Sequence, residues 1–235
     1  MDGTRWDGDW RERRRSATMA AMTAFDATRT VGVLLFDGFE PLDAFGPVEA
    51  FVIAEWPGSK PGDPRPFRVV TVAERLAPVA MRGGVRVAPE HDLAGCPALD
   101  VLLVPGGPGT RTGYRSASLL DFIAARAAAV EVLASVCTGA ALLAAAGVLS
   151  GLEATTNRRA FDWVVSVSPA DVRWDRTRRW VDAGRVVTSA GVSAGTDMAL
   201  HLVERLAGGE VARVAASRME YRWERSSACL EPRGA

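Results

Sequence analysis

Cys137 is the residue whose type and position most clearly predict chemistry. The apolar run Val130–Val136 is expected to form a strand and Thr138–Ala146 a helix, so the cysteine occupies a sharp strand-to-helix turn. Such a turn exposes a reactive side chain, as in a nucleophile elbow. A helix N-terminus and unpaired backbone N–H groups favour a thiolate, so we predict a lowered pKa for this thiol. The alternative is that Cys137 is only a small buried apolar residue.

Two other segments are candidates to work with the thiol. Gly106 and Gly107 follow the apolar strand Asp100–Pro105, where glycine N–H groups can approach a ligand closely and form an oxyanion pocket. An ordinary turn is the alternative. Asp43 stands near the start of a helix expected at 42–55. It is either an acid–base partner of the thiol or a charge that complements the helix dipole, and the residues alone favour the dipole.

The remaining cysteines and histidines carry weaker signals. Cys96 and Cys229 lack a comparable context, and three cysteines without a CxxC pair predict neither a disulfide framework nor a structural zinc site. A Cys–His dyad would require folding to bring His91 or His201 to Cys137. We therefore expect no metal site, and the sparse cysteines favour the reducing cytoplasm.

The overall composition argues against nucleic acid and membrane partners. Among 235 residues, 48% are hydrophobic, and 28 basic side chains balance 28 acidic ones. This balance gives no electrostatic reason to bind a polyanion. A basic run at residues 11–15 is interpreted as part of a solvated tail. The sequence contains neither an apolar run that could span a bilayer nor a signal peptide in residues 1–29.

Strand and helix patterns alternate along the chain. They predict an α/β fold with a doubly wound, mostly parallel sheet flanked by helices, and a small β-hairpin at 79–88 about Gly83 and Gly84. We expect one domain at 30–225, a flexible extension at 1–29 and a tail at 226–235. Ligands of such sheets bind beyond the carboxyl ends of the strands. The segments 37–43, 106–109 and 137–139 are all expected there.

Five ordered blocks resemble the DJ-1/ThiJ/PfpI superfamily, which shares its core with class I glutamine amidotransferases. They lie at 31–47, 100–107, 135–140, 149–156 and 188–197. The resemblance covers about residues 30–222 and implies a flavodoxin-like, amidotransferase-like sandwich, a cofactor-free site and a homodimer. It is strongest to isonitrile hydratases and to the amidotransferase-like domain of AraC-type regulators, which share Leu42-Asp43, Gly46-Pro47 and the Cys-Thr-Gly of the elbow.

The same resemblance implies roles for individual residues. It makes Cys137 the nucleophile, Asp43 the acid–base carboxylate and Thr138 the neighbouring hydroxyl. The protease-like branch carries histidine after the cysteine, so Thr138 argues against a peptidase. The chain also leaves no length for the helix-turn-helix domain of AraC-type regulators, so a regulator of that type is not expected.

Oxyanion and substrate binding are implied for Gly106, Gly107, Thr138 and Asn157. Relatives often carry histidine at the position of Asn157, so this residue bears on the substrate range. The leading hypothesis is hydration of an isonitrile to an N-substituted formamide, with a small molecule as the only partner besides a second copy of the chain. The alternatives are a non-catalytic small-molecule or redox sensor, and a glyoxalase- or amidase-like hydrolase.

Overall fold

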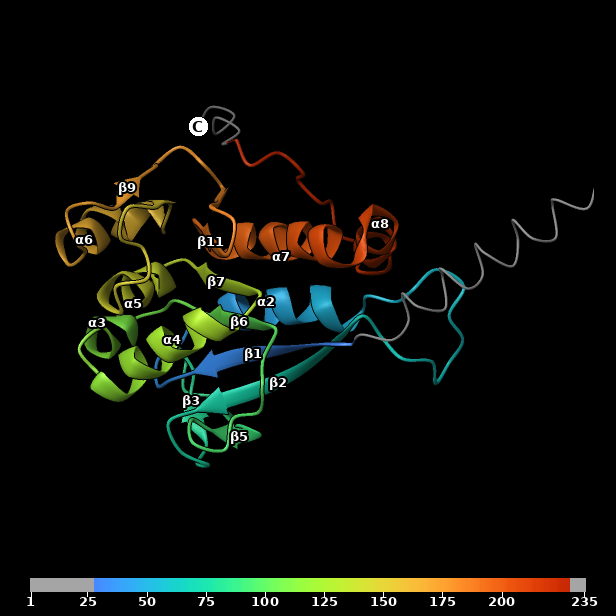
Figure 1. Cartoon of the computed structure of the whole chain (residues 1–235), viewed down its shortest axis with the longest axis horizontal. Helices are drawn as coiled ribbons and strands as arrows, with labels where there is room; N and C mark the ends of the chain where they lie inside the picture. The colour runs from blue at the N-terminus through green and yellow to red at the C-terminus, as the bar shows by residue number, and fades with distance from the viewer. Residues whose placement is uncertain (1–27, 229–235) are drawn as a thin grey trace, which may run out of the picture.

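The computed structural model describes residues 28–228 (Figure 1). Most of the predicted N-terminal extension, including its basic run, lies outside these residues, and so does Cys229. The first strand, β1 (Arg29–Leu35), begins within one residue of the predicted start of the domain.

A seven-stranded sheet in the order β10-β11-β7-β6-β1-β2-β5 forms the centre of the fold. Every neighbouring pair is parallel except β10 and β11. All residues of β6 and β7 are buried, as expected for strands covered on both faces. The predicted doubly wound α/β fold is therefore confirmed. Besides β1, the strands of this sheet are β2 (Phe67–Ala73), β5 (His91–Asp92), β6 (Val101–Val104), β7 (Val132–Val136), β10 (Trp180–Asp182) and β11 (Val186–Ser189).

The helices form two groups, one on each face of the sheet (Figure 1). In one group α2 packs against α7 and α7 against α8, and in the other α5 contacts α3, α4 and α6. The crossover from β1 to β2 runs in the opposite direction to that from β6 to β7. Because crossovers between parallel strands are right-handed as a rule, α2 and α4 cover opposite faces. The helices are α2 (Pro41–Val52), α3 (Thr110–Gly113), α4 (Ala117–Ala129), α5 (Gly139–Ala145), α6 (Phe161–Ser166) with the preceding 3-10 turn η1 (Arg158–Ala160), α7 (Val192–Ala207) and α8 (Gly209–Arg218).

The strand order decides where a site can form. The chain leaves β1 toward β2, and later returns to the other side of β1 to place β6 and then β7. The carboxyl ends of β1, β6 and β7 therefore lie side by side at a topological switch point, where sheets of this kind bind ligands. The three predicted site segments follow these three strands directly.

The smaller elements agree with the sequence in part. The predicted hairpin forms from β3 (Val79–Ala80) and β4 (Arg86–Val87), and a short parallel pair joins β8 (Glu153–Ala154) to β9 (Arg173–Trp174). The strand β5 and the helix α3 were not expected, because a two-residue strand has no periodicity and Gly-Pro-Gly before α3 is typical of a turn. Between residues 28 and 228, the helices lack the combined length and apolar character that a membrane crossing needs.

Candidate functional site

The backbone at Cys137 has the geometry of a nucleophile elbow. Strand β7 ends at Val136 and α5 begins at Gly139, so the cysteine stands in the turn between them. Its φ angle is 57°, which lies in the left-handed region that L residues rarely adopt. Holding a residue other than glycine there costs on the order of 1–3 kcal/mol, so the surrounding structure must fix it.

Three neighbours fix this turn. The N–H of Cys137 donates to the carbonyl oxygen of Ser189 at 3.0 Å, and its carbonyl oxygen accepts from the Thr156 hydroxyl at 2.8 Å. Gly139 allows α5 to start against β6, because a Cβ there would lie 2.3 Å from the carbonyl oxygen of Val104. The elbow is thus set by β6, β11 and the segment after β8, as well as by its own sequence.

Asp43 lies beside the thiol in the interior of the fold. Its side chain belongs to α2 and is fully buried, with Oδ2 accepting the Gly106 N–H at 3.0 Å. Oδ1 is buried without a hydrogen-bond partner among the described residues. Gly106 permits this approach, because a Cβ there would lie 2.8 Å from Oδ2. Complementing the helix dipole therefore does not account for Asp43, whose carboxyl faces the ends of β6 and β7.

Both ionisable groups of this pair are held toward their neutral forms. Burial raises the pKa of Asp43 to about 7, against the stabilising effects of the Gly106 N–H and the Cys137 thiol. Burial, with repulsion from Asp43, raises the pKa of the Cys137 thiol to about 12. The predicted lowering of the thiol pKa is therefore wrong. A helix of only seven residues and the N–H of Thr138 do not offset the desolvation of a side chain that is 7% exposed.

A hydroxyl network joins Thr138 to the loop after β6. Thr138 Oγ1 accepts the Gly107 N–H at 3.0 Å and the Thr110 hydroxyl at 3.0 Å. The N–H groups of Gly106 and Gly107 are therefore both engaged, by Asp43 and Thr138 respectively. The predicted oxyanion role of Gly107 requires Thr138 Oγ1 to release its amide. The N–H of Thr138, which stabilises the sulfur of Cys137, is already directed at the reacting atom.

Asn157 comes from the segment after β8 and lines the same cavity as Cys137. Its side-chain oxygen caps η1 by accepting the N–H groups of Arg159 at 3.0 Å and Ala160 at 3.2 Å. The same side chain interacts with Cys137 and lowers the pKa of the thiol, although less than burial raises it. Asn157 thus connects the thiol to the 3-10 turn η1, which follows β8.

A cavity of about 350 Å³ opens over the thiol. Of the six predicted site residues, Gly107, Cys137, Thr138 and Asn157 line it, whereas Asp43 and Gly106 are buried behind them. The remaining lining residues include one carboxylate and three guanidinium groups, Glu40, Arg82, Arg111 and Arg159. From the sequence, Glu40 is an acid–base candidate of similar standing to Asp43. The three arginines were not predicted, because they lie on separate segments, the β3–β4 hairpin, α3 and η1, and carry no local motif. Among the arginines, only Arg159 had a signal in the sequence, because it lies two residues after the predicted site residue Asn157.

The two histidines lie away from the cavity. His201 Nε2 is 2.8 Å from Asp182 Oδ2, and its ring lies against Trp180. His91 is in the edge strand β5. The Cys–His dyad considered from the sequence is thus not formed. Within residues 28–228, no three His, Cys, Asp or Glu side chains gather as metal ligands.

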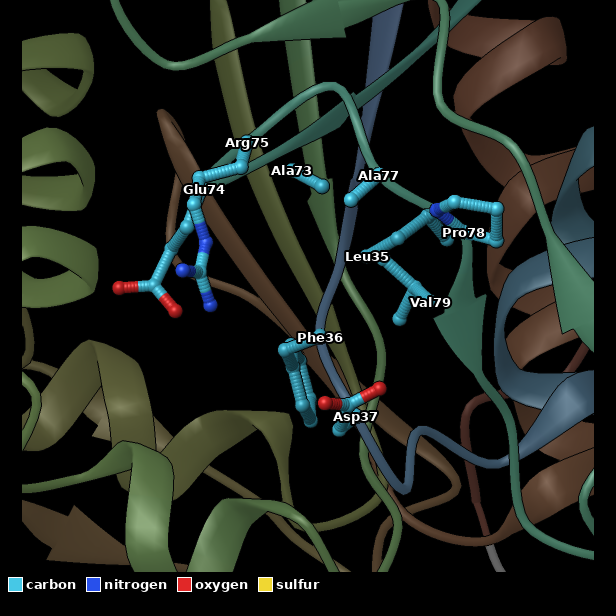
Figure 2. Close-up of a pocket in the computed structure, with 9 residues that line it drawn as sticks. All are labelled: Leu35, Phe36, Asp37, Ala73, Glu74, Arg75, Ala77, Pro78 and Val79. Atoms are coloured by element: carbon cyan, nitrogen blue, oxygen red, sulfur yellow. The ribbon is translucent and has the colours of Figure 1, made fainter.

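A second, smaller hollow of about 80 Å³ lies near the end of β1 and contains none of the predicted site residues (Figure 2). Figure 2 shows Phe36 and Asp37 on one side of it and the loop after β2 on the other. Asp37 Oδ1 accepts the Ala80 N–H at 2.8 Å, which ties β1 to the hairpin. We assign this hollow no chemistry, because its lining residues include no nucleophile.

Comparisons with known proteins agree with this geometry. A model of the DJ-1/PfpI family matches residues 29–205. An isonitrile hydratase from Pseudomonas putida is 35% identical over 191 residues, which are 81% of this chain and 78% of the hydratase. The HTH-type transcriptional regulator GbdR of Pseudomonas aeruginosa is 28% identical over 185 residues, 78% of this chain but 48% of the regulator. A ThiJ/PfpI family crystal structure from Pseudomonas syringae has a TM-score of 0.70 at 29% identity, and the match covers 84% of this chain and 77% of that one.

Proposed function

This chain belongs to the DJ-1/PfpI family, and from that premise we propose that it is a cysteine-dependent enzyme acting on a small electrophile. The specific reaction that we propose is hydration of an isonitrile to an N-substituted formamide. The similarity to an isonitrile hydratase supports this choice of substrate. The family also includes proteins named as regulators, so the argument for catalysis must come from the site.

One observation carries the proposal, namely the buried pair of Cys137, which lines the cavity, and Asp43, which lies behind it. Burial raises the pKa of Asp43 to about 7, so this carboxyl can both accept and release a proton near neutral pH. General acid–base catalysis works best when the pKa of the group is close to the operating pH. The Cys137 thiol, with its pKa raised to about 12, keeps its proton until a base removes it.

The first half of the reaction forms a covalent intermediate. Ionised Asp43 removes the proton of the Cys137 thiol as the sulfur attacks the terminal carbon of the isonitrile. A carbon–sulfur bond forms, and Asp43 delivers the proton to that same carbon to give a thioimidate. The N–H of Thr138 lies where it can stabilise charge that develops beside the sulfur.

The second half releases the product with water. Asp43, again ionised, accepts a proton from water as its oxygen adds to the thioimidate carbon. Protonated Asp43 then gives this proton to the nitrogen, and the carbon–sulfur bond breaks. The hydroxyl proton of the intermediate passes through Asp43 to the sulfur, so the formamide leaves and the Cys137 thiol is restored. Water supplies every atom that is added, so the scheme needs no electron carrier and no metal.

A redox sensor is less well supported by this site. Oxidation sensing depends on a thiolate that is present at rest and exposed. The thiol here is 7% exposed and its pKa is raised to about 12. A glyoxalase- or amidase-like hydrolase would use the same nucleophile, so only a test of substrates separates that alternative from a hydratase.

The proposal is tested by assaying a panel of small isonitriles for formamide formation. We expect turnover by the wild type, and loss of turnover in Cys137→Ala and in Asp43→Asn. Cys96→Ala is the matched control, because Cys96 is buried in a loop that does not line the cavity. Absence of turnover by a folded wild type would refute isonitrile hydration. Carbonyl and amide substrates would then test the hydrolase alternative.

A further inference from the structure

We propose that the cavity selects electrophiles that carry an anionic group, with a carboxylate bound by the guanidinium groups of Arg111 and Arg159. This inference rests on the proposed function and specifies its substrate class. The isonitrile would then carry a carboxylate on its carbon skeleton, and the reactive carbon would face Cys137 while the carboxylate faces the arginines.

The charges that line the cavity are unbalanced in favour of an anion. Arg82 is paired with Glu40 at 2.8 Å, which leaves Arg111 and Arg159 without a carboxylate partner among the described residues. Arg111 lies over the ring of Trp163, 4.1 Å from its centroid, and its guanidinium makes no hydrogen bond within residues 28–228. Arg159 makes no side-chain hydrogen bond or ion pair there either. Two guanidinium forks are thus free to bind a ligand.

The backbone beneath both arginines is anchored to the reactive site. Asn157, which interacts with the thiol, accepts the N–H of Arg159 at 3.0 Å. The backbone N–H of Thr110, the residue before Arg111, donates to the carbonyl oxygen of Gly107 at 3.1 Å. Because the backbone at Arg111 and Arg159 is already fixed, less conformational entropy is lost when their side chains bind a ligand.

The chemistry of the groups then indicates the ligand. A guanidinium presents parallel N–H donors that match the two oxygens of a carboxylate, and such charge-assisted bonds are stronger than neutral ones. Stacking on Trp163 keeps the plane of Arg111 oriented. A cavity of about 350 Å³ suits a small molecule. An isonitrile that carries a carboxylate therefore offers a reactive carbon to Cys137 and an anionic group to Arg111 and Arg159.

The test compares isocyanoacetate with its uncharged methyl ester. We expect the wild type to favour the carboxylate in kcat/KM by about tenfold, and Arg111→Gln and Arg159→Gln each to reduce this preference by about threefold, because each removes one of two charge-assisted contacts. Arg158→Gln is the matched control, since that guanidinium donates to the carbonyl oxygens of Arg176 and Thr177 and does not line the cavity. It should leave both rates unchanged. Equal use of the two substrates by the wild type would overturn the inference and leave the hydratase proposal standing.

A second measurement decides the inference if neither isonitrile is turned over. The rates at which iodoacetate and iodoacetamide alkylate Cys137 are measured by site-resolved mass spectrometry, which separates this cysteine from Cys96 and Cys229. Each reagent forms a carbon–sulfur bond and releases iodide, and the two differ in charge. We expect the ratio of the iodoacetate rate to the iodoacetamide rate to fall by about tenfold or more in the Arg111→Gln/Arg159→Gln double variant. An unchanged ratio would overturn the inference whatever the enzyme's substrate is.

Discussion

Replacing Asp43 by asparagine is expected to stabilise the folded protein at pH 8. Burial raises the pKa of Asp43 from 3.8 to about 7, and each pKa unit corresponds to about 1.36 kcal/mol. The folded state therefore binds this proton more tightly than the unfolded state. The stabilisation is fully present below pH 3.8 and is lost as the pH rises through about 7, so above that pH the ionised carboxylate costs about 4 kcal/mol. Asparagine removes the charge and keeps an oxygen that can accept the Gly106 N–H.

The assay is urea unfolding of the wild type and Asp43→Asn at pH 4 and pH 8. The free energy of unfolding of the variant should exceed that of the wild type by up to about 4 kcal/mol at pH 8, and the difference should shrink toward zero at pH 4. Other titrating groups cancel in this difference. Asp121→Asn, at an exposed position on α4, is the control and should change stability little at either pH. A variant less stable than the wild type at pH 8, or a difference independent of pH, would refute the reasoning.

Three further outcomes are expected. If ionised Asp43 removes the Cys137 proton, kcat/KM for isonitrile hydration should rise with pH through a midpoint near 7, and a fall across that range would contradict the assigned role. Gly139→Ala should destabilise the fold by about 2 kcal/mol or more in urea unfolding and abolish turnover, because the new Cβ would lie 2.3 Å from the carbonyl oxygen of Val104. The homodimer implied by the family resemblance should give twice the mass of one chain in light scattering, and a monomeric mass would contradict it.

The fold could be predicted because its main signals are local. Four- to seven-residue apolar runs such as those of β6 and β7 indicate strands buried on both faces, and their alternation with helices indicates a parallel sheet. The elements that the sequence did not predict are among the shortest ones. The strand β5 has two residues and is defined only by its pairing with β2. The helix α3 follows Gly-Pro-Gly, where turn chemistry obscures a single helical turn.

The site could be predicted only as far as single segments allow. The elbow at Cys137 is visible because one strand leads directly into one helix. The environment of the thiol is not visible, since its desolvation and the repulsion from Asp43 depend on residues 94 positions apart, which only the folded sheet brings together. The prediction of a lowered thiol pKa failed for this reason. The arginines of the cavity were not predicted, because they lie on three separate segments, the β3–β4 hairpin, the helix α3 and the turn η1.

Several features around Cys137 lower the stability of the fold, and they favour a chemical role for this site over a role in packing. A residue other than glycine is held at positive φ, a carboxyl is buried at 0% exposure, and one of its oxygens has no hydrogen-bond partner among the described residues. Each of these features destabilises the fold, and a neutral side chain at position 43 would avoid the largest of them. Stability alone therefore does not explain why the carboxyl stands beside the thiol. The proton transfer that we propose between the two groups would explain it, because such a transfer requires a buried base whose pKa lies close to neutrality.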